Sequence, residues 1–299
     1  MNNIIQTTSE LMMPSRNLDY IAVERALMLQ LREYCNDAMQ CWYVVGVSGG
    51  VDSAVVSTLC AKTWLPLYVV ELPIHQSEAE ITRAQEHIAW LKSNFPNVIE
   101  WREDLTQVFD LMAEKISHVA STLQWAGDTR LAIANTRSRL RMTSLYAMAG
   151  TFWLLVAGTG NRVEDYGIGF FTKYGDGWVD VSPIGDLYKS EVRELGRQMN
   201  ILPTLTEAIP TDGLHTDGST DEDQIGATYD ELEWAMDQHD TYTDIASSNW
   251  LMYNDPYVTE SCIEQFSGRA KQVMEIYTTR HTINQHKMKM PPVFRFPLG

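Results

Sequence analysis

The sequence predicts an α/β protein built on a doubly wound parallel sheet with helices on both faces. Four short apolar runs have strand character, at residues 42–47, 67–72, 98–101 and 152–157. Helical patterns separate them, and strand alternating with helix is typical of a parallel sheet that helices cover. A glycine-rich turn follows the first run, at the sheet edge where such folds bind ligands.

The helical patterns can be placed in chain order. Residues 18–39 read as an amphipathic helix because Ile21, Leu27, Met28 and Leu31 recur near helical spacing. Later, Thr228 and Glu231 form a capping-box signal that starts another helix. The remaining helical patterns lie at residues 53–62, 78–92 and 105–123.

Two segments interrupt this regularity. Residues 206–220 are rich in Asp, Gly and Thr, which predicts a mobile loop. Residues 240–256 look irregular and are interpreted as a possible insertion. We therefore expect residues 1–299 to form a single domain with a core at about 18–292.

Composition narrows the class of function. The net charge of −16 and a pI near 4.8 argue against sequence-independent nucleic-acid binding, which needs a basic surface. The four cysteines form no C-x-x-C pair, so neither zinc nor a dithiol is indicated, and Cys60 is expected to pack as a small hydrophobe. With no apolar run long enough for a membrane span and no signal-peptide pattern, we expect a cytoplasmic protein.

The most informative motif is Ser48-Gly49-Gly50-Val51-Asp52-Ser53, between an apolar run and a helical pattern. The unpaired N–H groups of a helix start, with the positive end of its dipole, make such a turn an anion site. The turn lacks the Gly-Lys-Ser/Thr of a Walker A motif. Asp52 would repel a bare phosphate, so it indicates a magnesium ion shared with the phosphates.

This turn resembles the pyrophosphate-binding loop of the ATP pyrophosphatases, which have a Rossmann-like fold, and further stretches resemble the NAD synthetases in particular. They cover residues ~40 to 292 in the family's order, a combination that no single motif provides. The stretches are Asn135-Thr-Arg-Ser-Arg-Leu-Arg-Met142, Gly158-Thr-Gly-Asn-Arg-Val-Glu164, Gly169-Phe-Phe-Thr-Lys-Tyr-Gly-Asp-Gly177, Val179-Asp-Val-Ser-Pro183, Asp186-Leu-Tyr-Lys189, Pro210-Thr-Asp-Gly-Leu214, Thr220-Asp-Glu-Asp223, and His286-Lys287 before Pro291-Pro292.

The resemblance implies a ligase of NAD biosynthesis that amidates deamido-NAD with ammonia and converts ATP to AMP and pyrophosphate. Transfer of AMP to the nicotinate carboxylate turns one oxygen into a good leaving group, which ammonia then displaces. About 40 residues precede the first strand run, too few for the amidase domain of glutamine-using members. Free ammonia is therefore the expected donor, and the family further implies a homodimer.

The resemblance also assigns residues to ATP. Asp52, Lys189 and Glu164 are the candidate catalytic residues, with Asp52 and Glu164 holding magnesium and Lys189 meeting the phosphates. Without its flanking motif, Lys189 could equally be a surface lysine. The full ATP-binding set is Gly46, Val47, Ser48, Gly49, Gly50, Val51, Asp52, Ser53, Thr159, Lys189 and Thr211, and we call residues 46–53 the glycine loop.

For deamido-NAD the resemblance assigns Arg139, Lys173, Asp180, His286 and Lys287. On a helix, arginines at 137, 139 and 141 would fan out, so at most one or two of them can reach a ligand. Asn135 and Tyr34 are weaker candidates for this ligand, and Gln76 and Arg83 are guesses for the adenosine. Trp178 stands where the family usually has glycine, where it would either stack on a ring or narrow the site.

Two alternatives stay open. The chain could be another amidating or thiolating ATP pyrophosphatase that shares the glycine loop alone. It could also be a nucleotide-binding regulator that keeps the fold without turnover, although Asp52, Glu164 and Lys189 argue against this. Release of AMP with and without deamido-NAD distinguishes an enzyme from a sensor.

Overall fold

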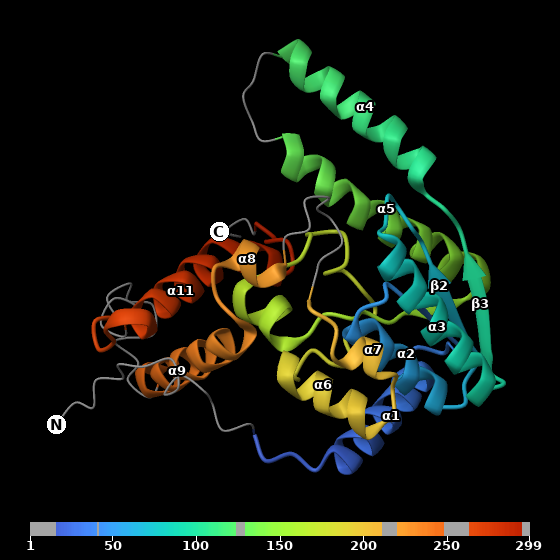
Figure 1. Ribbon diagram of the computed structural model, residues 1–299, viewed down its shortest axis with the longest axis horizontal. Helices are drawn as coiled ribbons and strands as arrows, with labels where there is room; N and C mark the ends of the chain where they lie inside the picture. Colours follow the sequence, from blue (N-terminus) through green and yellow to red (C-terminus); the bar gives the residue numbers. More distant parts are fainter. Residues whose placement is uncertain (1–15, 41, 124–128, 211–219, 248–262, 295–299) are drawn as a thin grey trace, which may run out of the picture. The chain divides into compact units, whose positions relative to one another are not determined.

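The computed structural model describes residues 16–40, 42–123, 129–210, 220–247 and 263–294 (Figure 1). The chain divides into two compact units. Among the described residues, the sheet unit lies within Ser15–Arg162 and Phe171–Gln224, and the helical unit lies within Val163–Phe170 and Ile225–Gly299. The expected single domain stays a prediction.

The sheet unit contains a four-stranded parallel sheet in the order β3-β2-β1-β4. In register, Val45 of β1 lies opposite Val69 of β2. These central residues are fully buried, which explains why their runs are continuously apolar rather than alternating. The strands are β1 (Trp42–Gly46), β2 (Leu67–Glu71), β3 (Val98–Arg102) and β4 (Leu154–Val156), so all four predicted strands are confirmed.

The predicted start of the last strand is wrong by two residues. Phe152 ends the helix α5 (Thr129–Phe152) rather than beginning β4. Trp153 then has a φ of 58°, and this left-handed residue separates the helix from the strand. A boundary between two apolar elements leaves no polar turn residues to mark it.

Helices cover both faces of the sheet, as the fold class predicts. One face packs against α1 (Tyr20–Asp37), α2 (Val51–Lys62), α3 (Glu78–Asn94) and α6 (Lys189–Gln198) around a core that includes Val45, Val69 and Leu59. The other face packs against α5, with Val44, Val70 and Ala149 in its core. Figure 1 shows α4 (Thr106–Leu123) beside the first part of α5.

The strand order places the nucleotide crevice. From β1 the chain proceeds outward to β2 and β3, then returns so that β4 lies on the opposite side of β1. The order therefore reverses between β1 and β4, and ligands of doubly wound sheets bind at this switch point, beyond the carboxyl ends of the strands. The glycine loop follows β1, and residues 158–161 follow β4.

The helical unit contains α9 (Tyr229–Ser247) and α11 (Gly268–Met288), together with most of the π-helical turn η2 (Arg162–Ile168). The capping box of α9 is confirmed, because Glu231 N–H donates to Thr228 Oγ1 and Thr228 N–H donates to Glu231 Oε2. The predicted irregularity of residues 240–256 is wrong at its start, since α9 continues to Ser247 without a glycine or proline to stop it. Residues 248–256 lie outside the described residues.

α7 (Pro203–Thr206) and α8 (Asp221–Ile225) flank residues 211–219, which are not described. Asp223 accepts hydrogen bonds from the N–H and hydroxyl of Thr220, so these two residues cap the start of α8. Within the described part of the chain, no helix is long and apolar enough to cross a bilayer.

A buried histidine of α3, His87, contacts Ser57 of α2 and is expected to make the fold sensitive to acid. The Ser57 hydroxyl donates to Ser53 O at 2.7 Å, so it accepts from His87 Nε2 at 2.9 Å. His87 Nδ1 is then a lone-pair acceptor, and it has no hydrogen-bond partner among the described residues. Burial lowers the pKa of His87 from 6.5 to about 4, because a protonated ring would leave a buried N–H unpaired.

We expect the folded protein to become less stable as the pH falls, because His87 resists protonation in the folded state. An unfolded His87 takes up its proton near pH 6.5 and the folded one only near pH 4, so stability is lost between these values. Between pH 7 and pH 4.5, His87 alone should lower the free energy of unfolding by about 2 to 3 kcal/mol. His87→Gln keeps a donor for Ser57 and cannot be protonated. Urea unfolding at both pH values should show a smaller loss in the variant; equal losses would contradict the assignment.

Candidate functional site

The glycine loop has a backbone conformation that depends on Gly49. Its φ is 84°, and a Cβ at this position would lie 2.4 Å from the Glu80 carbonyl oxygen of α3. Ser53 fastens the turn, because its hydroxyl donates to Gly50 O at 3.0 Å and accepts from Ser48 N–H at 3.2 Å. Gly50 precedes α2 and has no side chain to cap it, which suits an anion at the start of this helix.

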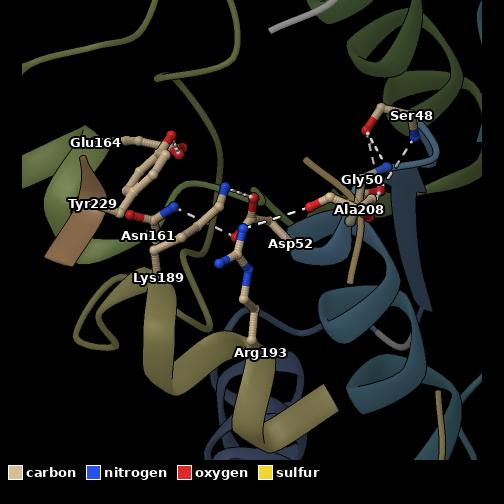
Figure 2. Close-up of polar contacts among 10 residues, drawn as sticks. Ser48, Gly50, Asp52, Asn161, Glu164, Lys189, Arg193, Ala208 and Tyr229 are labelled. Carbon is tan, nitrogen blue, oxygen red and sulfur yellow. Dashed lines mark hydrogen bonds and ion pairs between the residues drawn. The ribbon is translucent and has the colours of Figure 1, made fainter. Parts of the chain in front are cut away.

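Asp52 lies in the first turn of α2, where its carboxylate meets two side chains from distant parts of the chain (Figure 2). Lys189 Nζ donates to Asp52 Oδ2 at 2.6 Å, and Asn161 Nδ2 approaches Oδ1 at 3.4 Å. Lys189 begins α6, and its side chain is only 6% exposed. The alternative of a surface lysine is therefore wrong, because a buried ammonium needs this paired carboxylate.

The loop after β4 brings Asn161 to the same place. Gly158 is required there, since a Cβ would lie 2.6 Å from the Val179 side chain. Thr159 follows it and is partly exposed. Asn161 is fully buried and was not assigned a role from the sequence, although it stands in the quoted stretch Gly158-Thr-Gly-Asn. Its position at the end of a strand, next to the switch point, was the available signal.

Two further ATP candidates are not part of the described sheet unit. Glu164 belongs to the helical unit, where its Oε1 accepts from the Tyr229 hydroxyl at 2.6 Å. Thr211 lies outside the described residues. Joint binding of magnesium by Asp52 and Glu164, and the contact of Thr211 with ATP, stay predictions.

Three of the deamido-NAD candidates lie in the sheet unit. Arg139 of α5 donates to the Lys173 carbonyl oxygen at 3.2 Å, which ties the helix to residues 169–177. Lys173 Nζ lies 5.4 Å from the centroid of the Tyr174 ring. That ring packs against Trp178 with centroids 5.1 Å apart and the ring planes tilted by 34°, so Trp178 contacts a protein ring here.

Asp180 has a structural partner for each carboxylate oxygen. Oδ2 accepts from Val156 N–H of β4 at 2.8 Å, and Oδ1 accepts from the Tyr146 hydroxyl at 3.2 Å. Burial and the Asp180 charge raise the pKa of Tyr146. Tyr34, a weaker candidate, donates to the Asp180 carbonyl oxygen at 2.8 Å. These contacts anchor the end of β4, and the binding role of Asp180 stays a prediction.

His286 and Lys287 lie on α11, in the helical unit. His286 is exposed, and its Nδ1 lies 3.0 Å from the Ile283 carbonyl oxygen. Lys287 Nζ donates to Gly169 O at 2.7 Å. Lys287 therefore contacts the start of the stretch 169–177 that the sequence singled out.

The remaining candidates make contacts within the protein. Arg141 donates to the Leu72 carbonyl oxygen and to Gln76 Oε1, and burial lowers its pKa to about 10. Arg83 donates to Gly49 O at 3.0 Å and so supports the glycine loop. Arg137 is buried with its guanidinium over the Phe109 ring, and Asn135 Oδ1 accepts from the Thr172 hydroxyl. The predicted fan of arginines on one helix is confirmed.

A parallel sheet with an aspartate-bearing glycine loop at its switch point defines an enzyme of the ATP pyrophosphatase fold. A family model described as NAD synthase matches residues 23–291. The chain belongs to this family, and the expectation of an NAD synthetase is confirmed.

Individual relatives agree over most of the chain. An NH(3)-dependent NAD(+) synthetase from Methanosarcina acetivorans is 32% identical over 84% of this chain and 88% of the relative. One from Saccharolobus solfataricus is 30% identical over 94% of this chain and 91% of the relative. The solved structure of an NMN synthetase from Francisella tularensis is 28% identical with a TM-score of 0.74, covering 94% of this chain and all of that one.

Proposed function

We propose that the glycine loop binds the phosphates of ATP and that this site activates the nicotinate carboxylate of deamido-NAD for attack by ammonia, releasing AMP and pyrophosphate. The observation that carries this is the buried pair of Asp52 and Lys189 at the start of α2, beyond the carboxyl end of β1. It provides an acidic and a basic group at the N-terminus of a helix, which suits a triphosphate with its cation.

The chemistry needs charge neutralisation more than a protein nucleophile. A carboxylate oxygen of the substrate attacks the α-phosphorus, and pyrophosphate leaves from the opposite side. The N–H groups of α2 and the Lys189 ammonium stabilise the charge that develops on the phosphates. Ammonia then attacks the carbonyl carbon of the acyl adenylate, and AMP leaves.

Magnesium is the cation that fits Asp52. Mg²⁺ prefers oxygen ligands and is usually held by one or two carboxylates together with substrate phosphates. The Asp52 side chain is 16% exposed, so one oxygen can exchange its protein partner for a cation. Among the described residues, no three His, Cys, Asp or Glu side chains gather into a metal site. Bound magnesium would offset charge on the departing pyrophosphate, with Glu164 as the second proposed ligand.

Incubation of the purified protein with Mg-ATP, ammonium and deamido-NAD tests this proposal. We expect NAD, AMP and pyrophosphate in equal amounts, and no AMP when deamido-NAD is left out. Binding of ATP without product in the complete mixture would instead favour the regulator. Product formation from other acids alone would favour a different amidating ATP pyrophosphatase.

A second acid substrate is favoured by one feature of this chain. The related solved structure is an NMN synthetase, and the Tyr174–Trp178 pair occupies space next to Lys173, where the family usually has glycine at 178. A narrower site would accept the smaller nicotinate mononucleotide as well. Parallel measurement of kcat/KM for both acids tests this, and turnover of deamido-NAD alone would exclude it.

We further propose that the enzyme is a cytoplasmic homodimer. Reduced, buried Cys35 and Cys60 suit that compartment. On α4, Phe109 is buried against α5, whereas Val108, Leu111, Met112 and Val119 are each about half exposed. These four form one apolar stripe of the helix, and a second copy of the chain would cover it.

The α4 stripe gives a direct test of the dimer. Leu111→Glu is expected to weaken self-association at least tenfold, because a carboxylate would be buried without a partner. Ser117→Glu adds the same charge on the opposite side of α4 and should leave the dimer intact. Sedimentation velocity over a concentration series measures both variants. If Leu111→Glu leaves the dimer intact, the dimer interface lies on another surface of the protein.

A further inference from the structure

One face of α11 binds three successive carbonyl groups of a single turn. His281 Nδ1 donates to Gly167 O at 2.6 Å, and Asn284 Nδ2 donates to Ile168 O at 2.8 Å. Lys287 Nζ donates to Gly169 O at 2.7 Å. All of these residues belong to the helical unit, and we call the three side chains the α11 ladder.

The spacing of the ladder explains how three donors reach one turn. Residues three apart on an α-helix are neighbours on its surface, so residues 281, 284 and 287 follow one another along the helix. The turn comes close enough because Gly169 has no Cβ. A Cβ there would lie 2.4 Å from Asn284 Cβ, and Gly169 has a φ of 62°.

The same turn carries Glu164. Phe170 N–H donates to Glu164 O at 2.9 Å, which closes residues 164–170 into a loop. The Tyr229 hydroxyl of α9 donates to Glu164 Oε1 at 2.6 Å. The backbone is π-helical here, a rare geometry that is frequent at functional sites. Both the backbone and the carboxylate of this turn are therefore fixed by side chains from the two long helices.

We propose that His281, Asn284 and Lys287 are positioning residues that hold the Glu164 turn for its proposed function as a magnesium ligand. The inference rests on that function. Ligands must be held within about half an ångström to act, and a turn outside the α-helical pattern relies on side chains to hold its carbonyl groups. For Lys287 this assigns a contact with the protein backbone, in addition to the expected one with deamido-NAD.

Hydrogen exchange tests the ladder without any ligand. Asn284→Leu keeps the size of the side chain and removes its donor. Amides of residues 163–170 are expected to exchange roughly tenfold faster in this variant, because the turn opens more readily. Gln285→Leu is the matched control on α11, since the Gln285 amide contacts only Lys289 among the described hydrogen bonds, at 3.4 Å. Exchange rates unchanged by Asn284→Leu would overturn the ladder.

Magnesium titration of activity tests the link to Glu164. The magnesium concentration for half-maximal rate should rise several-fold in Asn284→Leu and in His281→Leu, and His281→Asn, which keeps a donor near Nδ1, should restore it. In a Glu164→Gln background, Asn284→Leu should add nothing, because the two changes act on one group. An additive effect would overturn the inference.

The two proposals fail in different ways. If Glu164→Gln itself leaves the magnesium dependence unchanged, the metal role of Glu164 is wrong whatever the ladder does. Alternatively, Glu164→Gln could shift the magnesium dependence while Asn284→Leu speeds amide exchange and leaves the magnesium dependence unchanged. The ladder would then stabilise the turn without positioning the ligand. The second result contradicts the inference alone.

Discussion

Asp52→Asn is expected to reduce the rate of AMP formation by about 10²- to 10³-fold while the protein stays folded. Asparagine keeps the shape of the side chain and can still accept from Lys189 Nζ, now 2.6 Å from Asp52 Oδ2. It lacks the negative charge that would hold a cation among the phosphates. A loss of this size corresponds to about 3 to 4 kcal/mol of transition-state stabilisation.

The measurement is single-turnover release of pyrophosphate, with thermal unfolding to confirm folding. The Lys189 ammonium stays nearly buried in the variant, so some loss of stability is expected from a charge facing a neutral amide. Asp110→Asn is the control, because it removes an exposed carboxylate that pairs with His75. Full activity of Asp52→Asn would show that the metal assignment is wrong.

The Asp52–Lys189 contact also explains how the site stays folded without ligand. A carboxylate at the start of α2 is favoured by the helix dipole, and Lys189 compensates the charge that remains. When a cation and phosphates bind, Lys189 can turn from the carboxylate to a phosphate oxygen without leaving the site. The pair is therefore compatible with magnesium binding by Asp52 and with phosphate binding by Lys189.

The fold was predictable because its signals are local. Continuous apolar runs indicated buried parallel strands, and the Thr228–Glu231 capping box marked the start of α9. Prediction failed where two apolar elements adjoin, at Phe152 and Trp153, because neither residue type is a turn signal. The helical nature of residues 240–247 was missed for a related reason, since polar residues alone do not stop a helix.

The site was predictable in its residues and less so in its contacts. Asp52 and Lys189 are 137 positions apart, and only the family's order of motifs placed them together. Sequence spacing could not show that Asp180 accepts from Val156 N–H of β4 or that Arg141 donates to Leu72 O, because both contacts join segments far apart in the sequence. Asn161 was missed because its one signal, a position after a strand at the switch point, is shared by the other residues of the same loop.

Gly49→Ala is expected to destabilise the protein by about 2 to 5 kcal/mol, with loss of ATP binding. Two effects add: about 1 to 2 kcal/mol for a left-handed residue with a Cβ, and about 1 to 3 kcal/mol for displacing packed backbone. The new Cβ would lie 2.4 Å from Glu80 O and 3.2 Å from Ala84 N of α3, and backbone atoms cannot rotate away. The strand-to-helix turn must therefore move.

Gly50→Ala is the matched control at the next residue. Gly50 has a φ of −98°, which alanine adopts readily, and its Cβ would lie 3.5 Å from Ser48 Oγ, an ordinary contact. Urea unfolding should therefore show a stability within about 0.5 kcal/mol of the parent protein for Gly50→Ala, and a clear loss for Gly49→Ala alone. Similar losses in both variants would mean that the close approach of α3 does not set the shape of the loop, since that approach is specific to Gly49.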